Sequence, residues 1–323
     1  MRIAIQRRPF ARTAALYAAT VALAALAACA IPAPHTPPPI VSSVPATIRV
    51  GINGRVVTMP IEDYVLGTAL AEVSPTGETA TTVTRVFEVQ AILARTFAVA
   101  HLGRHRAEGF DVCDGTHCQV YDAARLKSSR FAVDAARAVA ATRGVILRYA
   151  NRPAEALFHA DCGGHTAAAE TIWGGAPLPY LQSLADNVPT LEHRAWHLAL
   201  TSEDLRHALN LDPLTAVGGR LTGISVATHD ASGRAMTVQL DGERSPLVRA
   251  EELRAIVNRT FGAHGLQSTH FSLTRRTGTF VFDGVGYGHG VGLCQIGALT
   301  RARRGATAEQ ILSYYFPGTT LGR

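Results

Sequence analysis

The sequence predicts an α+β fold in which antiparallel hairpins and helices follow one another irregularly. Three observations support this prediction. Paired stretches with an apolar residue at every second position are joined by short turns such as Asn53-Gly54, which is typical of β-hairpins. Other stretches, for example residues 82–102, repeat apolar residues at helical spacing. The two kinds of stretch show no regular strand-helix-strand rhythm, which argues against a doubly wound parallel sheet.

In the first half of the body, the sequence predicts a hairpin, three helices and two further strands. Alternation from residue 47 to 58, interrupted by Asn53-Gly54, predicts the hairpin. Proline and two acidic residues predict the start of a helix at residue 60, and Ser74-Pro75 predicts its end. We expect this helix and the ones after it over residues 60–73, 82–102 and 129–142, and strands over residues 145–149 and 154–159.

In the second half of the body, the sequence predicts shorter elements and a glycine-rich stretch. Residues 187–219 are mixed and polar, with a short helix expected over residues 202–209. The expected elements after it are a hairpin of residues 224–228 and 236–240, a helix over 250–258, a hairpin of 271–275 and 279–282, and helices over 293–303 and after Thr307. Thr307 and Gln310 have the spacing of a capping box.

Charge and composition exclude some classes of function. The chain has 323 residues, with 31 Lys and Arg against 25 Asp and Glu, for a formal net charge of +6. Four of the arginines precede residue 29 in a stretch without acidic residues, so the remainder carries 27 against 25, or +2. A nearly neutral body lacks the clustered basic surface of a nucleic-acid-binding protein. We therefore expect no nucleic-acid partner.

Residues 1–28 have the layout of a signal peptide. Arginines precede the apolar run from Thr13 to Ala28, and the run ends at Leu-Ala-Ala-Cys29, which resembles the lipobox of bacterial lipoproteins. On this interpretation Cys29 is lipidated, residues 29–46 form a Pro-rich linker, and residues 47–323 form the body of an exported protein anchored to a membrane. A plain secretory signal peptide is the alternative, and it also places the body outside the cytoplasm.

Glu72 is the first candidate for catalysis. It ends a mostly apolar predicted helix, where burial penalises the ionised carboxylate and raises its pKa. A carboxylic acid that stays protonated near neutral pH can donate a proton to the oxygen of a glycosidic bond. The alternative is an ordinary, partly exposed glutamate near a helix end.

Cys113, His117 and Cys118 are candidate metal ligands. Two thiols and an imidazole within six positions supply three of the four ligands of a tetrahedral zinc site. The fourth would come from elsewhere, with His101, His105, His159 and Cys162 as candidates. In an exported protein a Cys113–Cys118 disulfide is the competing interpretation, and the spacing alone does not decide between the two.

Two glycine-containing segments are candidates for substrate binding. The first contains His159, Gly163, Gly164 and Thr166 at the end of a predicted strand. The second has glycine at alternate positions from Gly284 to Gly292 and includes His289 and Gln295. Glycines permit close approach of a ligand to the backbone, with the histidines, the threonine and the glutamine as polar groups. A simple tight turn is the alternative for the first segment.

Taken in order, five segments resemble the family of the stage II sporulation protein D and the amidase enhancer LytB. The likeness extends from about Thr47 to Leu321, nearly the whole body. Its distinctive residues here are Ile61 to Gly67 with Ala71-Glu72, Val89 to Thr96, Cys113 to Tyr121, His159 to Thr166 with Trp173-Gly174, and Gly288 to Ala298 with Tyr314 to Thr319. The resemblance implies a two-lobed domain with a central groove.

The resemblance also implies an activity. It implies a peptidoglycan lytic transglycosylase, in which Glu72 protonates the glycosidic oxygen between N-acetylmuramic acid and N-acetylglucosamine and then deprotonates the muramoyl C6 hydroxyl, which closes a 1,6-anhydro ring. The substrate supplies the nucleophile, so no second carboxylate is needed and no cofactor takes part in the chemistry. A glycan-binding protein that recruits or stimulates a cell-wall amidase, without cleaving glycan, is the alternative.

The resemblance bears on the cysteines as well. Some members hold zinc in the segment that matches Cys113 to Cys118, which favours a structural zinc over a disulfide there. Cys162 and Cys294 stand where serine is common in the family, and Ile296 stands where tyrosine is common. If the two segments meet, Cys162 and Cys294 can form an oxidised pair. Arg95 is expected to be a buried structural partner rather than a cleft residue.

Overall fold

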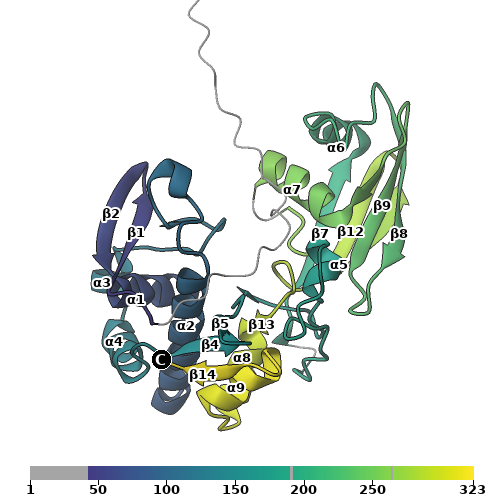
Figure 1. Ribbon diagram of the computed structural model, residues 1–323. Coiled ribbons are helices and arrows are strands. Elements are labelled where there is room, and N and C mark those ends of the chain that lie inside the picture. The colour runs from purple at the N-terminus through teal and green to yellow at the C-terminus, as the bar shows by residue number, and fades with distance from the viewer. Residues whose placement is uncertain (1–42, 190–191, 263–264) are drawn as a thin grey trace, which may run out of the picture. The chain divides into compact units, whose positions relative to one another are not determined.

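The computed structural model describes residues 43–189, 192–262 and 265–323 (Figure 1). The predicted signal peptide, its lipidation site Cys29 and most of the predicted linker lie outside these residues. Among the described residues, no helix is both long enough and apolar enough to cross a membrane.

The helices are distributed along the whole described chain. They are α1 (Ile61–Glu72), α2 (Ala80–Ala100), the 3-10 turn η1 (Arg106–Glu108), α3 (Arg125–Ser128), α4 (Ala132–Ala141), α5 (Ala169–Trp173), α6 (Ser202–Leu209), α7 (Ala250–Phe261), α8 (Gln295–Arg303) and α9 (Ala308–Tyr315).

The strands form small sheets with mainly antiparallel pairing. One sheet has the order β2-β1-β3, built from β1 (Thr47–Ile52), β2 (Arg55–Pro60) and β3 (Val112–Cys113). A second has the order β14-β4-β5, built from β4 (Ile146–Tyr149), β5 (Arg152–Pro153) and β14 (Thr320–Gly322). A third pairs β6 (Phe158–His159) in parallel with β13 (Leu293–Cys294).

Two more sheets come from the segment between β6 and β13. β7 (Ala195–Thr201), β11 (Phe271–Arg276) and β12 (Thr279–Val285) form a sheet in the order β11-β12-β7. β8 (Leu221–His229), β9 (Ala235–Gly242) and β10 (Leu247–Arg249) form a sheet in the order β10-β9-β8. These mixed helices and antiparallel sheets confirm the predicted α+β class.

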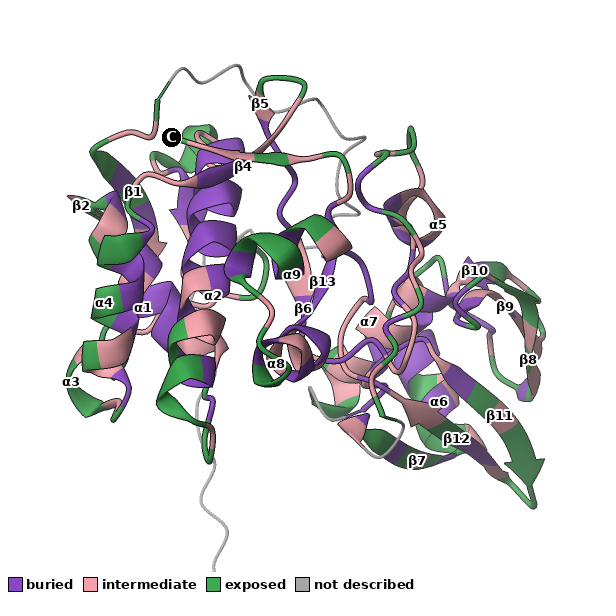
Figure 2. Cartoon of the chain, turned by 90° about the horizontal axis from the view of Figure 1, so that it is seen from below, coloured by how far each residue is buried: buried purple, intermediate pink, exposed green. Residues whose placement is uncertain are grey.

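The core divides into several clusters. One cluster consists entirely of residues between Trp196 and Phe282, packed between the last two sheets and helices α6 and α7. The other clusters are built from residues before 182 and after 290. The chain therefore leaves these other clusters after residue 181 and returns to them at residue 291. Helix α2 contacts α1, α4, α8 and α9, and much of it is coloured as buried in Figure 2. The expected central groove stays a prediction.

Local sequence signals explain the position of α1, which carries Glu72. The β1–β2 hairpin turns at Asn53 and Gly54, with φ of 48° and 75°, as Asn-Gly turns do. The helix then starts directly after Pro60. Arg95 of α2 is fully buried and donates two hydrogen bonds to the Glu62 carboxylate, at 3.0 Å and 2.6 Å. This ion pair fixes α1 against α2 and confirms that Arg95 is a structural residue.

The structure corrects two of the predicted elements. Residues 154–159 are not one strand, because Leu157 N–H bonds to the Glu155 carbonyl in a tight turn and only Phe158 and His159 pair as β6. The mixed region 187–219 contains strand β7, which the prediction missed. The alternation of Trp196, Leu198 and Leu200 on its inner face was the available signal.

Candidate active site

Glu72 is the last residue of α1, and its side chain is half-buried. Its Oε1 atom accepts a hydrogen bond of 2.8 Å from the backbone N–H of Val120. This contact links the end of α1 to the segment that follows the predicted metal ligands.

Burial raises the pKa of Glu72 to about 7, against an ordinary value of 4.5. Loss of hydration disfavours the charged carboxylate, and this effect outweighs the hydrogen bond from Val120, which favours the charged form. The raised pKa agrees with the expectation from the apolar helix. A carboxyl group of this kind is about half protonated at neutral pH, so it can serve first as an acid and then as a base.

Residues 119–121, whose Val120 N–H bonds to Glu72, are themselves fixed against helices α1 and α2. The Gln119 side chain is buried and donates hydrogen bonds of 3.2 Å to the Tyr64 hydroxyl and to the Ala94 carbonyl. The ring of Tyr121 stacks on Tyr64, with 5.7 Å between the ring centres. Gly67 permits this approach, because a Cβ atom there would overlap the Tyr121 ring. The Val120 N–H is therefore held in place from both sides.

A cluster of four metal-ligand residues lies just before this segment. It contains the three predicted residues and one of the four candidates for the fourth ligand: His105, Cys113, His117 and Cys118 have ligand atoms within 4.8 Å of one another. Cys118 Sγ lies 3.4 Å from His105 Nε2, and Cys113 Sγ lies 3.8 Å from His117 Nδ1. Both cysteines are free thiols in the structure, as are Cys162 and Cys294. Two thiols and two imidazoles are a donor set that suits tetrahedral zinc.

The other three candidates for the fourth ligand lie elsewhere. His101 Nε2 lies 3.2 Å from a carboxylate oxygen of Glu155. His159 and Cys162 belong to a separate group with Cys294.

The predicted substrate-binding residues gather around β6 and β13. His159 is buried, and its Nδ1 atom lies 3.1 Å from the Val291 carbonyl. His289 Nδ1 accepts a hydrogen bond of 3.0 Å from the Val291 N–H, and its ring packs between those of His159 and Trp173. Burial lowers the pKa of His289 to about 3 and the pKa of His159 well below its ordinary value. Both rings are therefore neutral.

Thr166 and Gln295 already have partners within the protein. The Thr166 hydroxyl is fully buried, donates to the Gln182 carbonyl at 3.0 Å and accepts from the Leu184 N–H at 2.9 Å. Gln295 is half-buried, and its side chain donates to Gln90 of α2 at 3.4 Å. A role of these side chains in binding substrate stays a prediction.

The glycines of the two segments have internal reasons to be glycine. Gly292 has φ of 73°, and a Cβ atom there would overlap the backbone carbonyl of Leu157. At Gly163, with φ of 71°, a Cβ atom would lie 3.0 Å from Val285. Gly164, with φ of 105°, lies beside His193. At Gly292 and Gly163 the missing side chain therefore makes room for other parts of the same chain, whereas Gly164 is favoured by its positive φ. Contact of Gly163 and Gly164 with substrate stays a prediction.

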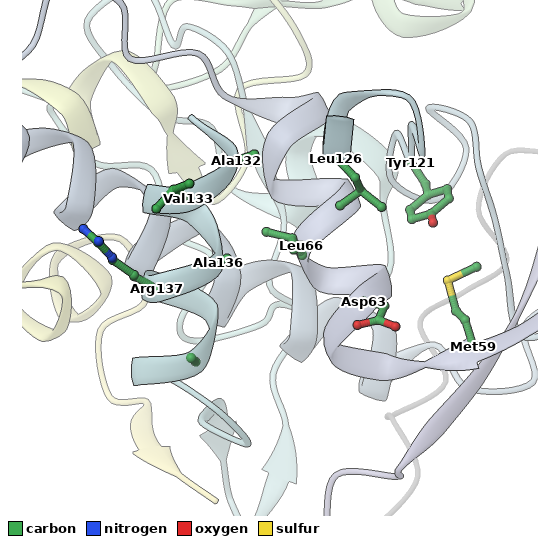
Figure 3. A pocket seen from close by; sticks show the side chains of 10 residues that line it. Met59, Asp63, Leu66, Tyr121, Leu126, Ala132, Val133, Ala136 and Arg137 are labelled. Atoms are coloured by element: carbon green, nitrogen blue, oxygen red, sulfur yellow. The ribbon is translucent and has the colours of Figure 1, made fainter. Parts of the chain in front are cut away.

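A largely apolar hollow lies along another part of α1 (Figure 3). It has a volume of about 840 Å³ and lies between α1, α4 and residues near Tyr121. Its charged lining residues are Asp63 and Arg137, while Glu72 does not line it.

Val120 is the functional contact that the sequence could not reveal. Val120 contacts Glu72 through its backbone N–H. Every residue except proline carries this group, so no side-chain pattern in the sequence marks the contact. The relevant signal lies in its neighbours, Gln119 and Tyr121, which anchor the segment.

Comparison with known proteins matches two family models. Residues 52–149 match the model described as Stage II sporulation protein (SpoIID), and residues 191–292 match a domain of unknown function (DUF8618). The first match contains Glu72 and all four residues of the Cys/His cluster. The second contains strands β7 to β12.

Curated relatives match most of the chain. Stage II sporulation protein D of Bacillus subtilis is 30% identical and is matched over 83% of this chain and 76% of its own length. An uncharacterized protein of Brachyspira hyodysenteriae is 29% identical over 81% of this chain and 66% of its own length. A Bacillus subtilis protein named amidase enhancer is 26% identical over 72% of this chain, and this chain spans 37% of its length.

Proposed function

Because the chain belongs to the stage II sporulation protein D family, we propose that it is a peptidoglycan lytic transglycosylase. It would cleave the bond between N-acetylmuramic acid and N-acetylglucosamine in bacterial cell-wall glycan. The observation that carries the proposal is the half-buried carboxyl group of Glu72, whose pKa is raised to about 7. At neutral pH this group can both give up a proton and take one back.

The proposed reaction uses one carboxyl group twice. Protonated Glu72 donates its proton to the glycosidic oxygen, and the bond from that oxygen to C1 of the muramoyl sugar breaks. The muramoyl C6 hydroxyl then attacks C1, and its proton passes to the Glu72 carboxylate. The products are a chain with a free N-acetylglucosamine hydroxyl and a 1,6-anhydromuramoyl end, and the enzyme returns to its protonated form.

A second carboxylate is not required, and α1 does not place one nearby. Hydrolases that use two carboxyl groups hold them about 5 to 9.5 Å apart. The other acidic residues of α1 are Glu62 and Asp63, in its first turn. At 1.5 Å per residue they lie about 13 to 15 Å from Glu72 along the helix axis. Glu62 is also engaged by Arg95.

We propose that the Cys/His cluster holds a structural zinc ion. His105, Cys113, His117 and Cys118 would be its ligands, and the ion would cross-link the loop that precedes Val120. A fixed loop keeps the Val120 N–H directed at Glu72. Elemental analysis should find about one zinc per chain, and Cys118→Ser should lose it. A zinc-free protein with a folded loop would contradict this proposal.

We also propose that the protein is exported and carries a lipid anchor on Cys29. The sequence of residues 1–28 supports this proposal, together with a substrate that lies outside the cytoplasm. Incorporation of labelled fatty acid by the wild-type protein, and its loss in Cys29→Ala, would test it. Labelling that persists in the variant would contradict the anchor at Cys29.

A non-catalytic function is the second candidate. A relative is named amidase enhancer, which supports a glycan-binding protein that stimulates a cell-wall amidase. Incubation of the purified protein with cell-wall sacculi distinguishes the two. Soluble fragments whose muramoyl ends are one water lighter than hydrolysed ends support the transglycosylase. Binding to sacculi without such fragments, with faster release of peptides by an added amidase, would support the second candidate.

A further inference from the structure

A second pair of cysteines lies away from Glu72 and the proposed zinc ligands. Cys162 follows β6 and Cys294 ends β13, and both side chains are fully buried. The Cys162 N–H donates to Cys294 Sγ at 3.2 Å. The ligand atoms of His159, Cys162 and Cys294 all lie within 4.8 Å of one another, so the two sulfur atoms are neighbours.

The surroundings of this pair differ from those of Cys113 and Cys118. Cys162 Sγ lies 3.1 Å from an Asp186 oxygen and accepts an N–H hydrogen bond of 3.3 Å from Gly164. A structural zinc site takes four protein ligands. Among the described residues, Cys162 belongs to two groups of three potential ligands, one with His159 and Cys294 and one with Asp161 and His193, and neither group has a fourth member. The donor set therefore fits a sulfur–sulfur bond better than a second metal ion.

We propose that Cys162 and Cys294 form a structural disulfide bond in the exported protein. The bond would join the turn from His159 to Thr166 to the segment from Gly288 to Gln295. The proposal rests on the proposed export, because disulfides form in oxidising compartments. It does not depend on the proposed glycan cleavage.

The oxidation is a two-step thiol–disulfide exchange with an external disulfide, either a protein oxidant or a small molecule. One cysteine thiolate attacks the oxidant, forms a mixed disulfide and releases one thiol. The second cysteine thiolate attacks the mixed disulfide, forms the Cys162–Cys294 bond and releases the second thiol. The two cysteines lose two electrons and two protons, and the oxidant gains both. Since both thiols are fully buried in the folded chain, the exchange takes place during folding.

The surrounding groups keep most of their hydrogen-bond partners after oxidation. Asp186 Oδ1 keeps Arg301 at 2.7 Å and the Tyr315 hydroxyl at 2.5 Å as donors. Asp186 Oδ2 loses the Cys162 thiol, its hydrogen-bond donor among the described residues, and this loss offsets part of the gain from the bond. The bond would also reinforce a weak connection, because β6 and β13 pair through only two residue pairs. The two cysteines are 132 positions apart, and closing a long loop restricts the unfolded chain strongly.

Peptide mapping tests the bond directly. The full chain is exported to the periplasm of a bacterial host, purified without reductant, denatured, treated with a thiol-alkylating reagent and digested. Mass spectrometry should find one linked pair of peptides that contain Cys162 and Cys294. Alkylation of both residues in most molecules would overturn the proposal. So would a metal ion that Cys113→Ser/Cys118→Ser retains and Cys162→Ser loses.

A matched variant tests the effect on stability. Cys162→Ser/Cys294→Ser keeps hydroxyl groups that can accept from the same N–H donors and donate to Asp186. Both proteins are unfolded in denaturant with a phosphine reductant, which reaches the buried bond only in the unfolded chain, and are refolded in its presence. This treatment should lower the melting temperature of the wild-type protein by on the order of 10 °C more than that of this variant. Equal responses would contradict the bond, and the Cys113/Cys118 pair, common to both proteins, cancels in the difference. If the variant does not fold, peptide mapping still decides.

Discussion

The environments of Glu72 and of the two histidines near β13 show opposite consequences of burial. Loss of hydration raises the pKa of Glu72 to about 7 and lowers the pKa of His289 to about 3. In both places the neutral form is favoured. The neutral form of a carboxyl group carries a proton that can be donated, whereas a neutral imidazole is no strong acid. The comparison favours Glu72 over the two histidines as the proton donor of the proposed reaction.

The hydrogen bonds of Glu72 also differ from those of the residues around β6 and β13. Glu72 accepts one bond from Val120 and remains half-buried. His159 Nδ1 lies against the Val291 carbonyl, but its buried Nε2 atom has no hydrogen-bond partner among the described residues. The Thr166 hydroxyl is engaged with the backbone at Gln182 and Leu184, and a hydroxyl whose partners are supplied by its own chain has little capacity left for a ligand. Variants of Glu72 and Thr166 should therefore differ in kind, with loss of rate in one and loss of stability in the other.

The largest effect should come from Glu72→Gln. The amide has almost the same shape but cannot donate a proton to the glycosidic oxygen, so the rate of anhydromuramoyl release should fall about 10²- to 10⁴-fold. The assay is product release from sacculi. Asp63→Asn, on the same helix but exposed and about 13 Å away, is the matched control and should keep its activity. A Glu72→Gln variant with wild-type activity would assign the chemistry elsewhere.

The pH dependence of stability should show a smaller effect of the same residue. The carboxyl pKa is about 7 in the folded chain and about 4.5 in the unfolded chain. Between these values the folded chain binds more protons, so the free energy of unfolding should decrease as the pH rises from 4.5 to 7. The decrease contributed by Glu72 is on the order of 3 kcal/mol.

Urea unfolding at several pH values measures this contribution. Glu72→Gln removes the titrating group, so the difference in stability between the wild-type protein and the variant should vary with pH over that range. A difference that stays constant from pH 4.5 to pH 7 would show that burial does not perturb this carboxyl group.

Thr166→Val should give the smallest effect, and this effect should be a loss of stability rather than a loss of rate. The change removes a hydroxyl that serves two backbone partners, which should cost about 1 to 3 kcal/mol of stability. The rate of glycan cleavage by the folded variant should stay at the wild-type level, measured below its unfolding temperature. A fall in rate without a loss of stability would instead place Thr166 in contact with substrate.

The sequence predicted most elements whose signals are local. The Asn53-Gly54 turn, the apolar repeat of α2 and the Thr307–Gln310 capping box were all confirmed. The errors arose where tertiary contacts decide. At residues 154–159 an inward-turned Glu155 pairs with His101 and interrupts the expected strand.

The sequence also predicted only part of the candidate site. Residue type identified Glu72 and three of the four residues in the Cys/His cluster, because acids and thiols are chemically distinctive. His105 was one of four possible fourth ligands, since spacing does not specify which distant histidine folds back. The glycines from Gly284 to Gly292 predict a surface for substrate, and composition alone does not reveal that a Cβ atom at Gly284, Gly290 or Gly292 would overlap other parts of the same chain.

Direct titration of the Glu72 carboxyl group tests the central claim most directly. Carbon-13 NMR of glutamate-labelled protein, with the Glu72→Gln variant used to assign the signal, gives the protonation of this one side chain as a function of pH. A midpoint near pH 7 is the expected result. A midpoint near 4.5, the ordinary value for glutamate, would show that Glu72 holds no proton to donate at neutral pH and would contradict its role as the catalytic acid.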